Sequence, residues 1–508
     1  MRITRAATVL LALGASGCSF APPAEPVAPV EALPEAFSQV EAQVEAQGDY
    51  EPYAWWTSFQ DPILDGLVDS VLVANLDLAV AVARVEEARA LLGISTADLF
   101  PSITGSAGAS RQDNPLNAGF GAIIGAILGG GVPGDSTGGG PPPEDGDGES
   151  DAPTRSKVNS FDASLGLSYE IDFWGRARND RGASMAELEA SASDYQVVQL
   201  GVLAEAITTY FDLVDLRSRI DLTEEIVDVL GERESLSEVR YNRGLVSSFE
   251  LYAVRQDRQA AQSSLPQLRS QLGDARRRMA LVSGRHLPEL DGILDGDPNP
   301  VSIMDPIPAG LPADLLWQRP DVRASASRLE AARLRVGARK AEMLPRITIS
   351  GTLGLQSATS EGLFDLSQWF SNLAAGLTQP LFQGGRLRAN LDAAEARYAQ
   401  ALAVYGQTVL TAVGEADTAL LRYREELTRY QLLSEQLDQA ESSVSLQAQR
   451  YRSGVGAYTD YLDALRILLT TQATLSGSAR DVALSRLGVH RALGGGWADV
   501  PGEFGIDQ

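Results

Sequence analysis

Few side chains in this sequence are of the types that catalysis or metal binding requires. The 508 residues include two histidines, His286 and His490, and one cysteine, Cys18. The histidines have no mutual spacing, and no accompanying carboxylates, that indicate catalysis or metal binding, so we expect both to be structural. We therefore expect no catalytic residue, no metal site and no cofactor. This composition favours a structural or transport protein over an enzyme.

Acidic residues dominate the charge. Asp and Glu number 67 against 42 Lys and Arg, a net charge of −25, which argues against a nucleic-acid partner. Asp460 and Asp463 follow a glycine turn and lie three apart, on one face of a predicted helix. They form either a solvated helix face with a favourable N-terminal charge or a functional pair.

The acidic segment 141–151 lacks the sixth-position glycine and closing glutamate of an EF-hand, so an external loop over 117–150 is favoured over a calcium site.

The N-terminus resembles a bacterial lipoprotein signal. Arg2 and Arg5 precede an apolar run over 6–14, which is too short to span a membrane, and the small residues 15–17 lead into Cys18. The resemblance implies a signal peptide over 1–17, lipidation of Cys18 and, from Ser19, sorting to the outer membrane. The alternative is an ordinary secretory signal with a chance cysteine. Residues 18–48 are rich in Pro and Ala and predict an extended, lipidated tether.

The chain contains one unit twice, over 49–300 and 301–497, followed by a tail over 498–508. Identical residues recur first at an offset of 244 and later at an offset of 210, because the first copy carries an insertion of about 34 residues. Identities at the first offset include Arg84/Arg328, Glu86/Glu330, Arg89/Arg333, Gly93/Gly337 and Pro101/Pro345. Identities at the second offset include Gly175/Gly385, Tyr241/Tyr451 and Gly244/Gly454.

Each copy contains two predicted strands. They cover about 102–111 and 160–173 in the first copy, and 346–356 and 369–382 in the second. Apolar and polar residues alternate along them, most regularly over 161–173, which is typical of an outer-membrane β-barrel with lipid outside and water inside. A half-buried soluble sheet is the alternative. Four strands cannot close a membrane barrel, so we expect several chains to share one.

Long helices follow the strands. Residues 176–242 and 386–452 lack proline and show helical apolar spacing, and at 1.5 Å per residue each predicted helix is roughly 100 Å long. Each ends at a glycine turn and is followed by a predicted return helix, over 248–283 and 459–493. These helix pairs predict a long coiled-coil part.

Four segments in order resemble the outer-membrane factors of tripartite efflux systems, the TolC/OprM type, in its lipoprotein branch. They are Trp55–Leu64, Gly310–Val322, Pro380–Arg386 and Ala492–Trp497. The resemblance implies a mainly α-helical protein with membrane β-strands. It further implies a homotrimer in which a 12-stranded outer-membrane β-barrel continues into a long periplasmic α-helical barrel. It also implies passive export, powered by an inner-membrane efflux transporter through a periplasmic adaptor, the membrane fusion protein.

The same resemblance implies roles for the turns. The adaptor-contacting tips would be Gly244, Leu245, Val246 and Ser247 in the first copy, and Gly454, Val455, Gly456 and Ala457 in the second. Asp460 and Asp463 would form acidic rings at the periplasmic aperture, and Tyr451 and Glu250 would tie neighbouring hairpins together. Gly456 replaces the basic residue that this family carries there. Two rival functions are a non-conducting coiled-coil strut and a lipid-anchored enzyme.

Overall fold

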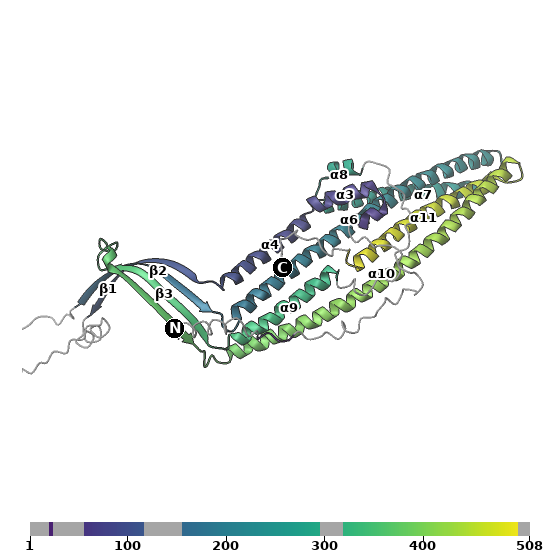
Figure 1. Ribbon diagram of the computed structural model, residues 1–508. Helices are drawn as coiled ribbons and strands as arrows, with labels where there is room; N and C mark the ends of the chain where they lie inside the picture. Colours follow the sequence, from purple (N-terminus) through teal and green to yellow (C-terminus); the bar gives the residue numbers. More distant parts are fainter. Residues whose placement is uncertain (1–19, 24–54, 116–154, 295–317, 496–508) are drawn as a thin grey trace, which may run out of the picture. The chain divides into compact units, whose positions relative to one another are not determined.

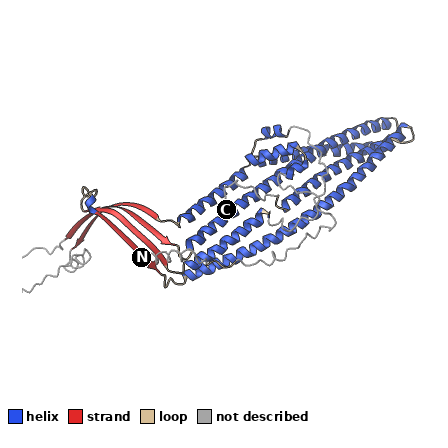
Figure 2. Cartoon of the chain, in the orientation of Figure 1, coloured by secondary structure: helices blue, strands red, loops and turns tan. Residues whose placement is uncertain are grey.

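The computed structural model describes residues 20–23, 55–115, 155–294 and 318–495. The predicted lipidation site Cys18, most of the tether, the 117–150 insertion and the tail lie outside these residues. The chain divides into two compact units. One consists of Met1–Phe20, Ser95–Arg178 and Ala338–Arg388, and the other of Ala21–Ile94, Asn179–Gly337 and Ala389–Gln508. The strands all belong to the first unit, and the second is helical (Figure 2).

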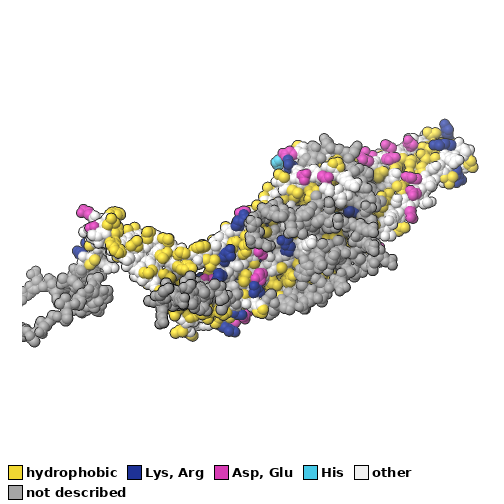
Figure 3. Space-filling model, viewed as in Figure 1, with side chains coloured by type: hydrophobic (Ala, Val, Ile, Leu, Met, Phe, Trp, Pro, Cys, Tyr) yellow, Lys and Arg dark blue, Asp and Glu magenta, His cyan; other side chains and the backbone are white. Residues whose placement is uncertain are grey.

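Four antiparallel strands form one sheet in the order β1-β2-β3-β4. Their bounds are β1 Ser102–Pro115, β2 Arg155–Ile171, β3 Arg346–Ser357 and β4 Trp369–Thr378. The register puts Ile103, Leu167, Gly351 and Leu373 in one row and Thr104, Gly166, Thr352 and Asn372 in the next. Because side chains alternate along a strand, most apolar positions of the four strands share one face and most polar positions share the other, although Val158 and Phe370 lie on the mainly polar face. In the view of Figure 3 this unit shows mainly hydrophobic and uncharged side chains, whereas charged ones gather over the helices.

Strand ends differ from the prediction. The last strand ends at Thr378 and not at 382, because Pro380 has no backbone N–H to donate to the ladder. Beyond it Leu381 and Phe382 are exposed. The first strand continues to Pro115 and the second begins at Arg155, since these two residues pair with each other. The second strand ends at Ile171, the last residue that pairs with β3.

The helical lengths repeat along the chain (Figure 1). The long helices α6 (Arg176–Asn242) and α10 (Arg386–Arg452) have 67 residues each, and the return helices α7 (Ser248–Val282) and α11 (Tyr458–Ala492) have 35 each. Helices α4 (Leu76–Ala97) and α9 (Pro320–Ala341) have 22 each. Shorter elements are η1 (Trp55–Phe59), α3 (Pro62–Ala74), α8 (Leu287–Ile293) and η3 (Leu366–Gln368).

Equivalent residues of the two copies make equivalent long-range contacts. Asn75 Nδ2 donates to the carbonyl of Val282, and Arg319 Nη1 donates to the carbonyl of Ala492, both at 2.7 Å. Asn75 and Arg319 are 244 apart, and the two carbonyl residues are 210 apart, which are the offsets of the duplication. Each copy therefore ties the end of its return helix to the start of its shorter helix.

The main apolar core lies among the helices of the first copy. Trp55, Phe59, Leu64, Leu203 and Ile207 are buried in it. The side chains at the start of the Trp55–Leu64 segment therefore belong to the core. A stretch of α6 is long and apolar enough to cross a membrane by length and composition, but 61% of it is buried inside the structure, as expected of a core helix.

His490 lies on α11 and is buried against Trp55, with the two rings stacked at a centroid distance of 4.9 Å. Burial, with a smaller contribution from Arg486, lowers the pKa of His490 to about 3, so the ring is neutral at physiological pH. His286 precedes α8 as its N-cap residue. Burial against Trp55 gives His490 a structural role, whereas His286 is exposed and its side chain makes no cap hydrogen bond.

Candidate functional site: the hairpin turns and the links between helices

Both helical hairpins turn through the same hydrogen-bond pattern. Gly244 N–H donates to the Tyr241 carbonyl at 2.8 Å, and Leu245 N–H donates to the Arg240 carbonyl at 2.9 Å. The α10–α11 turn repeats both bonds at positions 454 and 455, each at 3.0 Å. Gly244 and Gly454 have φ values of 70° and 76°, in the left-handed region where glycine carries no steric penalty. Both turns lie at the same end of the helical unit (Figure 1).

The turns present apolar side chains to the outside of the chain. Leu245 and Val455, at equivalent positions, are both exposed, and so are Phe249 and Tyr252 at the start of α7. The N-cap residues Ser247 and Ala457 make no side-chain cap hydrogen bond. The tips are therefore an apolar surface on a compact backbone turn.

Tyrosines surround the second turn. The rings of Tyr451 and Tyr458 lie 4.8 Å apart, and those of Tyr458 and Tyr461 lie 5.8 Å apart. Tyr458 Oη donates to a carboxylate oxygen of Glu232 on α6 at 3.1 Å. Burial, together with this hydrogen bond, raises the pKa of Tyr458. Tyr458 is not among the predicted site residues, because its hydrogen-bond partner is 226 residues away in the sequence.

The two predicted aperture carboxylates have different surroundings. Asp463 forms an ion pair with Arg233 of α6, in which the arginine side chain is 16% exposed and the carboxylate 45%. Asp460 is exposed in the first turn of α11, where its N–H donates to the Ala457 carbonyl. Within one chain, Asp463 thus links the second hairpin to α6, and Asp460 is a solvent-facing charge. The roles of Glu250, in the first turn of α7, and of Tyr451 between neighbouring chains stay predictions.

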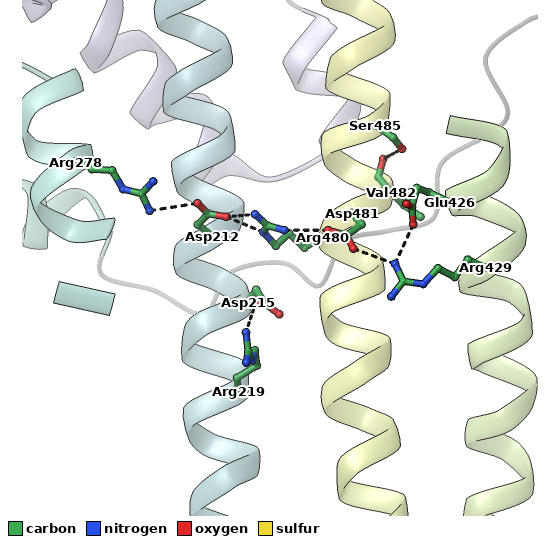
Figure 4. A network of polar contacts seen from close by, with 10 residues as sticks. All are labelled: Asp212, Asp215, Arg219, Arg278, Glu426, Arg429, Arg480, Asp481, Val482 and Ser485. Atoms are coloured by element: carbon green, nitrogen blue, oxygen red, sulfur yellow. Dashed lines mark hydrogen bonds and ion pairs between the residues drawn. The ribbon is translucent and has the colours of Figure 1, made fainter. Parts of the chain in front are cut away.

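A second set of links crosses four helices farther from the turns (Figure 4). Arg480 Nε of α11 donates to Asp212 of α6 at 2.7 Å, and Asp212 also contacts Arg278 of α7 at 3.4 Å. On the other side Arg480 pairs with Asp481 at 2.9 Å, and Asp481 accepts a hydrogen bond from Arg429 of α10 at 3.1 Å. Burial lowers the pKa of Arg480, but the hydrogen bond and charge of Asp212 outweigh it, so the net shift is upward. The network joins both hairpins through charged groups.

We predict that Arg480→Met destabilises the protein by about 2 kcal/mol, because it breaks the contact between α11 and α6 and leaves the mostly buried Asp212 with less compensation. Arg277→Met is the matched control. Arg277 pairs within α7 with Asp274, and both side chains are about 60% exposed, so its loss should cost less than about 0.5 kcal/mol. Thermal unfolding of both variants measures the difference, and equal midpoints would show that the four-helix network adds no stability.

Among the residues with described positions, no group of three or more His, Cys, Asp or Glu side chains is placed to hold a metal ion. The carboxylates of the network face arginines instead. Its chemistry is that of ion pairing between helices.

Each copy of the duplicated unit contributes two strands and one long helical hairpin, and the shared sheet has a mainly apolar and a mainly polar face. This combination defines a class of channel-forming outer-membrane proteins. The chain belongs to the outer membrane efflux protein family, which its sequence matches over residues 67–285 and 311–495. The two matched segments correspond to the two copies of the unit.

Relatives span nearly the whole chain. It is 29% identical over 500 residues to the solvent efflux pump outer membrane protein SrpC of Pseudomonas putida, covering 96% of this chain and 97% of the relative. It is 30% identical over 453 residues to the pyoverdine export outer membrane protein OpmQ of Pseudomonas putida, covering 88% and 89%. The solved outer-membrane channel OprN is similar at 27% identity and a TM-score of 0.77, covering 94% of this chain and 100% of that one. The comparisons confirm the predicted family, the fold class and a role in outer-membrane efflux.

Proposed function

We propose that this protein is the outer-membrane exit duct of a tripartite efflux pump, and that it works as a homotrimer. Substances would enter it from an inner-membrane transporter and a periplasmic adaptor and leave passively. The observation that carries the proposal is the sheet, in which most apolar positions share one face and most polar positions share the other across all four strands.

The edges of this sheet require partners. β1 and β4 are its edge strands, and their unpaired backbone groups could not be left exposed in lipid. In a trimer, β4 of one chain pairs with β1 of the next, and three copies give a closed barrel of twelve strands. The row with Leu167 and Leu373 then faces lipid, and the row with Thr104 and Thr352 faces the water-filled lumen.

The turns would form the periplasmic mouth. Exposed apolar side chains such as Leu245 and Val455, on rigid glycine turns, suit contact with an adaptor. Three copies of Asp460 would make an acidic ring that attracts cations. Glu250 and Tyr451 would connect neighbouring chains.

Lipidation of Cys18 would anchor each chain to the outer membrane independently of the barrel. A relative from Salmonella typhimurium, 28% identical over 492 residues, carries the name probable outer membrane lipoprotein SilC. The names of other relatives differ in what is exported, from solvents to pyoverdine. We infer that the duct serves the transporter's range and does not itself select the substance.

Thiol accessibility in the sheet separates the duct from a non-conducting strut. Thr352→Cys and Leu353→Cys are neighbours on opposite faces, and Cys18, the natural cysteine, is blocked when acylated. In planar bilayers we expect open channels, and a charged, membrane-impermeant thiol reagent should change the conductance of Thr352→Cys but not of Leu353→Cys. Bilayers that contain protein but show no conductance would support the strut, and equal reaction at both positions would contradict the assigned faces.

A further inference from the structure

The four residues described at the N-terminus, 20–23, include two that contact α9. Arg333 Nη1 donates to the carbonyl of Pro22 at 2.7 Å. The same guanidinium donates from Nε and Nη2 to the two carboxylate oxygens of Glu330, at 2.7 and 2.6 Å. Glu330 therefore holds Arg333 in an orientation that leaves one donor for the backbone of the N-terminal segment.

Gly337 lets this segment approach the helix backbone. A Cβ at position 337 would lie 2.8 Å from the Ala21 nitrogen and 3.0 Å from its Cα, which is closer than real Cβ atoms come to other atoms. It would also lie 3.0 Å from Nδ2 of Asn179. A glycine one turn after Arg333 thus provides the space, and the arginine provides the hydrogen bond.

The duplication supplies an internal comparison. Glu86, Arg89 and Gly93 of α4 stand at the positions equivalent to Glu330, Arg333 and Gly337. Arg89 pairs with Glu86 at 2.6 Å, as in the second copy, but a Cβ at Gly93 would have no other atom within 4 Å. The same three residues are therefore present in both copies, and in the described part of the chain those of α9 contact the backbone of the N-terminal segment.

We propose that Glu330, Arg333 and Gly337 form an anchor site that holds the segment following acylated Cys18 and so sets where the lipid enters the membrane. Cys18 precedes Ala21 by three residues, and three residues of extended chain span at most about 11 Å. The neighbouring residue Phe20 packs against Trp174, with ring centroids 6.3 Å apart. Tryptophan at the end of a membrane strand is typical of the membrane interface. The proposal rests on the lipidation proposed above.

The test measures how accessible Ala21 is. In Ala21→Cys protein with Cys18 acylated, the new cysteine is the free thiol, and its reaction rate with a polyethylene-glycol maleimide can be followed in outer membranes. We expect slow labelling in this parent and labelling at least about tenfold faster after Gly337→Leu or Arg333→Met. The matched controls are Gly93→Leu and Arg89→Met, at the equivalent positions of α4, and these should label at the parent rate.

Equal labelling rates in the parent and its four variants would overturn the anchor site. Faster labelling in the two control variants as well would also overturn it, because the effect would then come from altering either helix. Radiolabelled palmitate should be incorporated into every variant, and its absence, with Cys18→Ser as the blank, would remove the lipid from the proposal. Each preparation is also tested for channels in planar bilayers. If the α9 variants form channels but label at the parent rate, the anchor site is rejected and the proposed duct is retained.

Discussion

Replacing Asp463 with alanine should raise single-channel conductance strongly, whereas replacing Asp460 should mainly reduce the preference for cations. Asp463 holds α11 to α6 through Arg233, and the ion pair contributes about 1 kcal/mol per chain once the exposure of the carboxylate is considered. If three chains open together, losing three pairs shifts the closed–open equilibrium by more than about tenfold. Asp460 is exposed and makes no comparable link between helices in the described chain, so its loss removes charge only.

Salt and a charge exchange separate these effects. The influence of Asp460 should fade at high ionic strength, since exposed charges are screened over about 10 Å at 0.1 M. The exchange variant Arg233→Asp with Asp463→Arg should restore much of the closed state, because the pair is rebuilt in reverse. Conductance that is unchanged by Asp463→Ala in correctly folded trimers would mean that the α6–α11 ion pair does not hold the mouth closed.

Replacing Gly284 with alanine should prevent recovery of folded trimers. Gly284 follows α7 with a φ of 61°, and its Cβ would lie 2.1 Å from the Ala74 carbonyl oxygen and 2.9 Å from the carbonyl carbon. Backbone atoms cannot rotate away as a side chain can, so the α3–α4 junction would have to move. That movement would also break the hydrogen bond from Asn75 to Val282. We expect a loss of more than about 3 kcal/mol.

Gly244→Ala is the matched control. Gly244 has a φ of 70°, so alanine there has a backbone penalty of about 1 kcal/mol, similar to that at position 284. Its Cβ, however, would meet no atom within 4 Å. Trimer yield on native gels and thermal unfolding should therefore distinguish the two variants clearly. Similar behaviour of both would show that left-handed backbone strain, and not the contact with Ala74, decides the outcome.

Much of the architecture follows from periodicity. The alternation over 161–173 led to the two-faced sheet, since a strand turns its side chains by half a rotation per residue. The absence of proline over 176–242 and the glycine at 244 led to a helix whose observed bounds are Arg176–Asn242. The duplication could be found because identical residues recur at constant offsets on both sides of the insertion. The end of β4 was missed, since apolar residues recur as far as Phe382 although Pro380 cannot join the ladder.

Partners between helices were decided by the tertiary structure alone. The Asp463–Arg233, Arg480–Asp212 and Arg333–Pro22 contacts join residues 230, 268 and 311 positions apart. The sequence shows that Asp463 is acidic and on a helix, but several arginines of α6 could have faced it. Which one does depends on the rotation and axial shift of one helix against another, and these are set by how whole apolar faces pack. For the same reason the sequence alone identified Glu86, Arg89 and Gly93 as a repeat of Glu330, Arg333 and Gly337, while the fold determined that Ala21 and Pro22 contact α9.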